Sequence, residues 1–97
     1  MGNVLISEGA EEDYVESLQW YAERSKRAAE GFEAEFGEAM EAIAETPERY
    51  PTCDPRHRFY LTKRYPFQII YRTTVDGDLL IVAVAHASRR PGYWSKR

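Results

Sequence analysis

The residues best suited to chemistry lie in the second half of the chain, where arginine and lysine alternate with aromatic side chains. Arginine and lysine bind phosphate groups, and aromatic rings stack on unpaired bases. Trp, Tyr and Arg are also the residue types that dominate protein-binding hot spots. The group therefore indicates a binding surface for a nucleic acid or an acidic partner. Its members are Arg56, Arg58, Lys63, Arg64, Arg72, His86, Arg89, Arg90, Tyr93 and Trp94.

A metal-independent ribonuclease could be assembled from the same residues. It needs a base for the 2′-hydroxyl, an acid for the leaving oxygen, and cations around the phosphorane charge. His86 or Tyr93 could transfer the protons, and Arg72, Arg89 or Lys63 could stabilise the charge. The alternative is a basic surface that only docks an acidic partner. The residues alone leave both interpretations open.

The sequence predicts no metal site and no cofactor. The two histidines, His57 and His86, are 29 positions apart, and Cys53 is the only cysteine. Neither has a partner at a metal-ligand spacing, and Cys53 cannot form an internal disulfide. There is no glycine-rich phosphate loop. Carboxylates are abundant in the helical segments, where we expect them on solvated faces.

Charge is divided unequally along the chain. Residues Glu8–Arg49 include thirteen acidic and four basic side chains, a net charge of −9. Residues Tyr50–Arg97 include three acidic and nine basic side chains, a net charge of +6. The second half is therefore expected to attract polyanions, and the first half to repel them.

The hydrophobic pattern predicts one α+β domain over residues 1–97. Two runs rich in β-branched and aromatic residues flank Asp76-Gly77, a dipeptide typical of hairpin turns. Apolar residues three and four positions apart predict two amphipathic helices before them. In chain order we expect a strand at Val4–Ser7, a helix to about Arg24, a helix from about Arg27 to Glu45, and strands at His57–Thr62, Phe67–Thr74 and Leu79–His86.

The predicted order is therefore β-α-α-β-β-β: an N-terminal strand, a two-helix hairpin and a three-stranded antiparallel meander. The helices supply the burial that an isolated hairpin lacks. The chain contains no apolar run of about 18 residues, the length that a membrane span needs. Its first residues lack the basic region of a secretory signal. We therefore expect a cytoplasmic protein.

Motifs along nearly the whole chain resemble the RelE/ParE toxin superfamily of bacterial type II toxin–antitoxin systems. Within it, the proline-rich, tryptophan-bearing C-terminal end resembles the ParE-like branch, the plasmid stabilisation proteins. The resemblance rests on Ala10 and Asp13, Trp20-Tyr21, Phe32 and Phe36, residues 46–51 (TPERYP), Arg58, residues 65–72 (YPFQIIYR), Val84-Ala85-His86, and residues 89–94 (RRPGYW).

The resemblance implies a cognate antitoxin that wraps the toxin, and one of two activities. RelE-like members cleave mRNA in the ribosome, whereas ParE-like members poison DNA gyrase. Ribonucleolytic members usually have arginine where this chain has Gln68, so a candidate phosphate stabiliser is absent. His86, Arg89 and Tyr93 lie near the positions of the catalytic groups of such enzymes.

We therefore predict a ParE-type toxin that binds DNA gyrase by protein–protein contact rather than by catalysis. It would form a hetero-oligomer with its antitoxin. One alternative is a ribosome-dependent mRNA endoribonuclease with His86, Arg89 and Tyr93 as catalytic residues; another is a non-toxic antitoxin-binding module. The predicted target-binding residues are Lys63, Arg64, Arg72, Arg89, Arg90, Tyr93 and Trp94.

Overall fold

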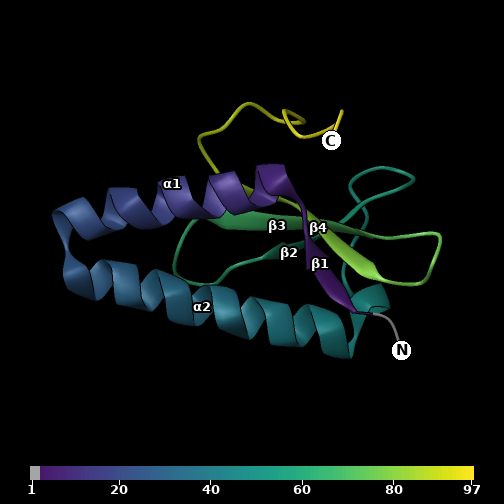
Figure 1. The fold of residues 1–97 in the computed structure, drawn as a ribbon, viewed down its shortest axis with the longest axis horizontal. Helices are drawn as coiled ribbons and strands as arrows, with labels where there is room; N and C mark the ends of the chain where they lie inside the picture. The colour runs from purple at the N-terminus through teal and green to yellow at the C-terminus, as the bar shows by residue number, and fades with distance from the viewer. Residues whose placement is uncertain (1–2) are drawn as a thin grey trace.

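A computed structural model describes residues 3–97 as two layers, a helical hairpin against one face of a four-stranded sheet (Figure 1). The predicted α+β order is confirmed, and the helix boundaries agree to within one residue. In chain order the elements are β1 (Val4–Ile6), α1 (Glu8–Arg24), α2 (Lys26–Glu45), the short 3₁₀ helix η1 (Pro47–Arg49), β2 (Arg58–Leu61), β3 (Phe67–Thr73) and β4 (Leu79–His86).

The sheet has the strand order β1-β4-β3-β2. Strands β2, β3 and β4 form the predicted antiparallel meander. Strand β1 pairs with β4 in parallel, Val4 opposite Leu79 and Ile6 opposite Ile81, so the sheet is mixed. The chain returns from the helices and the meander to lie beside its own first strand.

The loop between β3 and β4 confirms the predicted Asp76-Gly77 turn. The Gly77 N–H donates to the carbonyl of Thr74, and the Thr74 N–H donates to the carbonyl of Asp78. Gly77 has φ of 86°, which an L side chain rarely adopts. This residue therefore fixes the register of the hairpin.

Serine residues set the ends of both helices. The Ser7 hydroxyl accepts a hydrogen bond from the Ala10 N–H and caps α1. Ser25 is the single residue between the two helices. Its N–H donates to the carbonyl of Tyr21 at the end of α1, and its hydroxyl accepts from the Ala28 N–H at the start of α2. None of the helices within residues 3–97 is long and apolar enough to cross a membrane.

Apolar side chains are buried on both faces of the sheet. Between the helices and the sheet, Phe32 and Ile43 of α2 pack with Phe67 and Ile69 of β3. On the opposite face, a smaller cluster contains Ile70, Val82, Ala83 and Trp94. The register shifts where Ile70 pairs with Ala83 and Tyr71 with Ile81, which leaves Val82 as an extra residue in β4. The bulge turns Val82 and Ala83 toward the same small cluster.

Candidate functional site

The residues after β4, 87–97, form a C-terminal segment that turns back over the smaller cluster. Consecutive backbone hydrogen bonds shape it: Arg89 N–H to the carbonyl of His86, Ser95 N–H to that of Gly92, and Arg97 N–H to that of Trp94. Gly92 has φ of 75°, which glycine supplies at this bend. The segment is therefore an ordered series of turns rather than a free tail (Figure 1).

The carboxylate of Asp13 fastens the C-terminal segment to α1. Asp13 is 5% exposed and accepts hydrogen bonds from the Tyr93 hydroxyl at 2.9 Å and from the Arg97 guanidinium at 2.7 and 3.3 Å. It also accepts the Val84 backbone N–H at 3.1 Å. Arg89 completes the group at 3.9 Å. One buried carboxylate thus joins a helix, a strand edge and the segment after that strand.

The ring of Tyr93 lies between two guanidinium groups. The Cζ atoms of Arg89 and Arg97 lie 3.8 and 5.1 Å from the ring centroid, within the range of cation–π attraction. Burial, followed by the hydrogen bond to Asp13, raises the pKa of the Tyr93 hydroxyl well above its ordinary value. The hydrogen bond to Asp13 likewise raises the pKa of Arg97. Tyr93 is therefore neutral and Arg97 charged under physiological conditions.

Trp94 anchors the segment from its other side. The ring is 8% exposed, packs on Ile70, Val82 and Ala83, and meets the His57 ring edge-on at 4.9 Å. The Nδ1 atom of His57 lies 2.9 Å from an oxygen of Asp54. Hydrogen bonds from His57 and from backbone N–H groups outweigh desolvation and lower the pKa of Asp54. The connector between the helices and β2 is thus tied to the same segment.

A cavity of about 690 Å³ lies between the C-terminal segment and the end of the sheet. Five residues that were predicted for a binding or catalytic role line it together with Gln68 of β3: His86, Arg89, Arg90, Tyr93 and Trp94.

Comparison with known proteins identifies the family. Residues 4–91 match the family model described as the ParE toxin of the type II toxin–antitoxin system parDE. The chain belongs to the ParE toxin family. A solved structure titled "Chromosomal ParDE TA system from P. aeruginosa" is similar, with a TM-score of 0.76 and 16% sequence identity over 89% of this chain and 96% of that chain. At this identity the likeness shows the fold alone. No curated protein matches the chain.

The structure brings together only part of the binding set predicted for this ParE-family chain. Lys63 and Arg64 are exposed in the turn between β2 and β3, where the Arg64 backbone N–H donates to Glu35 at 2.9 Å. Arg72 lines a separate cavity, near η1 and the start of β2. None of these three residues lines the cavity beside the C-terminal segment.

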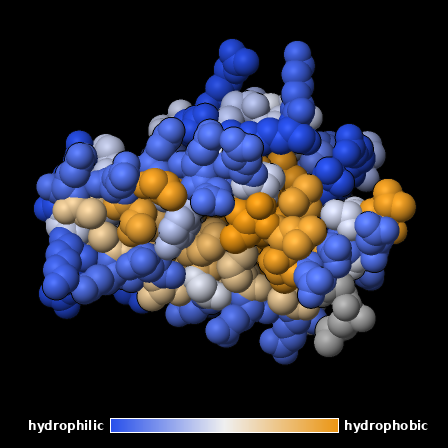
Figure 2. Space-filling model, viewed as in Figure 1, coloured by the Kyte–Doolittle hydropathy of each residue, from blue (hydrophilic) through white to orange (hydrophobic). Residues whose placement is uncertain are grey.

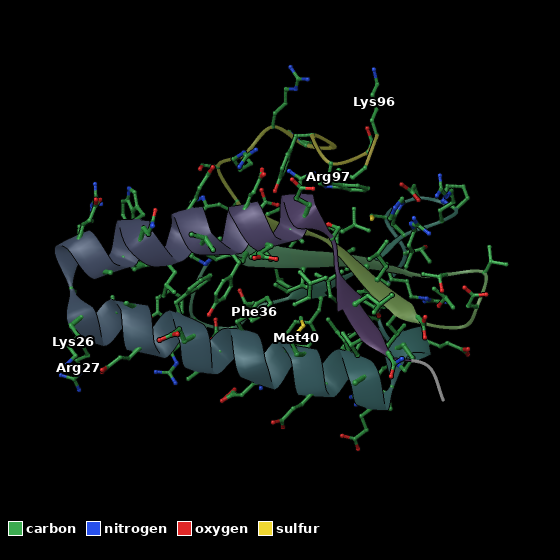
Figure 3. The ribbon with its side chains drawn as sticks, viewed as in Figure 1. Lys26, Arg27, Phe36, Met40, Lys96 and Arg97 are labelled. Atoms are coloured by element: carbon green, nitrogen blue, oxygen red, sulfur yellow. The ribbon has the colours of Figure 1, made fainter. Side chains whose placement is uncertain are left out.

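Trp94 differs most from its expected role. We predicted that it would be presented to a partner as part of a basic, aromatic surface, whereas its ring is buried against β3 and β4. The exposed part of the segment is basic instead. Arg90 and Lys96 are exposed, and the Arg89 side chain is 43% exposed. Lys96 points into solvent while Arg97 lies beside the start of α1 (Figure 3).

His86 also lines a second cavity, of about 360 Å³, together with Trp20 and Tyr21 of α1. Its Nδ1 atom accepts the Ser88 backbone N–H at 3.0 Å and lies 2.7 Å from the Ser88 hydroxyl. Because Nδ1 is an acceptor, the proton of neutral His86 is on Nε2. Its ring meets Phe67 edge-on at 5.1 Å.

The expectation that the helical carboxylates lie on solvated faces is wrong for Asp13 and Glu35. Both are buried, and Glu35 accepts the backbone N–H groups of Arg64 and Tyr65. The signal for these two acids was their spacing: Asp13 follows Ala10 by three positions and Glu35 follows Phe32 by three, so each acid lies on the apolar stripe of its helix.

Sequence reasoning also missed Arg97. No group of three or more metal-binding side chains occurs within residues 3–97.

Proposed function

We propose that this member of the ParE toxin family acts in the cytoplasm by inhibiting DNA gyrase, and that a cognate antitoxin neutralises it. The observation that carries the proposal is the C-terminal segment. Its buried side holds it in one conformation through Asp13 and Trp94, and its outer side exposes Arg89 and Arg90. A fixed surface that binds a partner loses little conformational entropy on association.

An exposed apolar surface supports the proposal that an antitoxin binds this chain. The side chains of β1, Val4, Leu5 and Ile6, are 38–48% exposed, and Val15 of α1 is 41% exposed. Apolar atoms gather in the region of β1 and between the two helices (Figure 2). Met40 and Phe36 of α2 lie along the same side of the molecule (Figure 3). An apolar strip of this kind is typical of a protein-binding site.

Charge supports the same assignment. The helices carry most of the acidic residues, and the second half of the chain carries most of the basic ones. A partner with an acidic stretch beside an apolar helix would match both the strip and the C-terminal segment. The antitoxin is therefore expected to cover the apolar strip and to extend toward Arg89 and Arg90.

The ribonuclease alternative has less support from the geometry. The Tyr93 hydroxyl donates to Asp13, and its pKa is raised. A general acid or base works best with a pKa near the operating pH, so Tyr93 is poorly suited to proton transfer. Gln68 lines the cavity where an arginine would stabilise a phosphorane. Of the three candidate catalytic residues, His86 is the one suited to proton transfer, because its Nε2 atom makes no hydrogen bond within residues 3–97.

Gyrase supercoiling with the purified protein tests the proposal. The chain should inhibit supercoiling, and the pair Arg89→Ala/Arg90→Ala should weaken inhibition about tenfold or more, as expected for hot-spot arginines. The matched control is Arg27→Ala on α2, an exposed arginine outside the C-terminal segment. Trp94→Ala is unsuitable as a surface variant because the ring is buried.

Pulse labelling of bacteria that express the chain alone separates the alternatives. Failure of DNA synthesis before protein synthesis is expected. If protein synthesis fails first and His86→Ala abolishes the effect, the gyrase assignment is wrong and the ribonuclease alternative holds. Absence of growth arrest, together with stable binding of a neighbour-encoded protein, would instead identify a non-toxic antitoxin-binding module.

A further inference from the structure

Three arginines meet in a cavity at the opposite end of the sheet from His86. The cavity has a volume of about 290 Å³ and is lined by Arg56, Arg58 and Arg72, together with Glu48 of η1, Tyr71 and Thr73. We call it the arginine cavity. It shares no lining residue with the cavity beside the C-terminal segment.

The fold explains why the three arginines line one cavity. Strand β2 begins at Arg58, opposite Tyr71 of β3. Strand β3 continues through Arg72 to Thr73, so these two residues extend beyond the start of β2. The connector from Pro55 to Arg56 and the helix η1 close the space beside them. The cavity thus lies where β3 extends beyond the start of β2.

The arginines in the cavity have no carboxylate partner. Among the ion pairs within residues 3–97, none involves Arg56, Arg58 or Arg72. Arg58 donates to the backbone carbonyl of Tyr50 at 2.6 Å. The Nε–H of Arg72 is buried and has no hydrogen-bond partner within residues 3–97. A buried donor attached to a cation is costly to leave unpaired, so an acceptor is expected at this position.

Neighbouring groups do not supply that acceptor. The Tyr71 hydroxyl donates to the carbonyl of Pro47. Burial raises the pKa of Tyr71 to about 12. The charge of Arg58 lowers this pKa in part. Asp54 accepts from the backbone N–H of Arg56 and from His57. The Asp54 carboxylate is therefore already occupied.

We propose that the arginine cavity binds a doubly charged phosphate group. Three guanidinium groups and the single carboxylate of Glu48 leave a net charge of +2 at the cavity, which a dianion neutralises. Guanidinium groups present paired donors that match phosphate oxygens. The Nε–H of Arg72 gains its acceptor in the bound state. The proposal concerns a site separate from the C-terminal segment and does not depend on the gyrase assignment.

Side-chain NMR of the full chain tests the site. The Nε–Hε resonances of the arginines are followed while inorganic phosphate is added at constant ionic strength, with chloride as the replaced anion. The Arg72 resonance should shift downfield and saturate, because its Nε–H acquires a charged acceptor. Acetate and dimethyl phosphate, each with a single charge, should bind at least about tenfold more weakly, in line with the loss of a charge-assisted hydrogen bond.

Arg56→Gln is the test variant, because Arg56 is exposed in a loop and its side chain makes no contact that the fold needs. It should weaken phosphate binding about tenfold while the backbone amide spectrum stays the same. Arg27→Gln, an exposed arginine on α2, should leave the affinity unchanged. Arg72→Lys assigns the Arg72 resonance and keeps the charge.

Three results would overturn the proposal. The first is a shift of the Arg72 resonance that grows linearly with phosphate and does not saturate. The second is equal binding of acetate or dimethyl phosphate, which would exclude a requirement for a dianion. The third is an equal loss of affinity in Arg56→Gln and Arg27→Gln, which would show general charge screening rather than a site.

Discussion

The two arginine groups of this molecule differ in what balances their charge. At the C-terminal segment, Arg89 and Arg97 face the buried carboxylate of Asp13. At the arginine cavity, Arg56, Arg58 and Arg72 form no ion pair within the described residues. Arginine therefore occurs in two settings in this small fold, paired with a buried acid and without an ion pair among the described residues.

The difference teaches how to distinguish structural from functional arginines. Arg97, 2.7 Å from the buried Asp13, stabilises the position of the chain, because removing either partner leaves the other without compensation. Arg89 lies farther away, at 3.9 Å, and its 43% exposed side chain can also contact a partner. A group of arginines that forms no ion pair within the described residues is available to an external anion, as we propose for the arginine cavity. Residue type and spacing are similar in both groups, and only the placement of the acidic residues separates them.

Asp13→Ala should produce the largest loss of stability, because the Val84 N–H, the Tyr93 hydroxyl and the Arg97 guanidinium lose their acceptor. Arg89 loses its ion pair as well. Both arginines are partly exposed, 26% and 43%, so water can solvate them. We therefore expect a loss of about 3 kcal/mol in the free energy of unfolding. Urea unfolding measures it.

The control for this change is Glu11→Ala in the same helical turn, where the side chain is exposed and the change should be within about 0.5 kcal/mol. An equal loss in both variants would contradict the assignment of Asp13 as the anchor of the C-terminal segment.

Glu35→Ala should cost about 2 kcal/mol, because the backbone N–H groups of Arg64 and Tyr65 lose a charged acceptor. No arginine side chain is paired with Glu35 among the described ion pairs. The two variants should also differ in how their loss of stability depends on salt concentration. Added salt should reduce the effect of Asp13→Ala by screening its arginines, but should change the effect of Glu35→Ala less. Glu38→Ala, an exposed neighbour, is the control.

Tyr93→Phe should have a smaller effect that depends on pH. Near neutral pH, loss of the hydroxyl that donates to Asp13 should cost about 1 kcal/mol. In the folded protein the Tyr93 pKa is raised, whereas in the unfolded chain it is about 10. The contribution of this hydroxyl is therefore complete below about pH 10 and is lost as the pH rises toward the folded pKa.

The stability gap between wild type and Tyr93→Phe should thus close above about pH 10. Urea unfolding across that range measures it. A gap that widens with rising pH would show that Tyr93 ionises more easily in the folded state. Tyr71→Phe provides a comparison, since Tyr71 is also a buried phenol with a raised pKa but has no contact with Asp13.

Gly9→Ala should have the smallest effect on stability and a specific effect on the segment. A Cβ at Gly9 would lie 2.6 Å from Nε of Arg97, so the guanidinium must move. Alanine is favoured over glycine in a helix by about 1 kcal/mol, which offsets most of the loss. The Nε–Hε resonance of Arg97 should shift while the unfolding free energy changes little. An unchanged resonance would contradict the close approach of Arg97 to α1.

The elements were predictable because local patterns determine them. Asp76-Gly77 specified the hairpin, and the spacing of Phe32 and Ile43 specified the buried face of α2. The parallel pairing of β1 was not predictable, since Val4–Ile6 is too short to encode a direction. It depends on where the meander ends relative to the first strand, which is a property of the assembled sheet.

The site was predictable in composition but not in arrangement. The sequence identified Arg89, Arg90 and Tyr93, which the structure brings together. It also grouped Arg72 with them, although that residue lies in another cavity. Arg72 pairs with Leu80, at the end of the sheet opposite to His86, and sequence spacing does not reveal which end of a sheet a strand residue reaches. Nor does it reveal that Trp94 fills a hydrophobic cluster rather than facing solvent.

The anchoring of the C-terminal segment by Asp13 also constrains the time course of folding. The bonds from Val84, Tyr93 and Arg97 to Asp13 join residues 71 to 84 positions apart. The helical hairpin and the β3–β4 hairpin involve near neighbours and can form early, whereas contacts between distant residues close slowly. Until they close, the edge of β4 that Ser7 and Asp13 cover remains open. The slowest step of folding is thus also the period in which this chain is most exposed to mispairing with other chains.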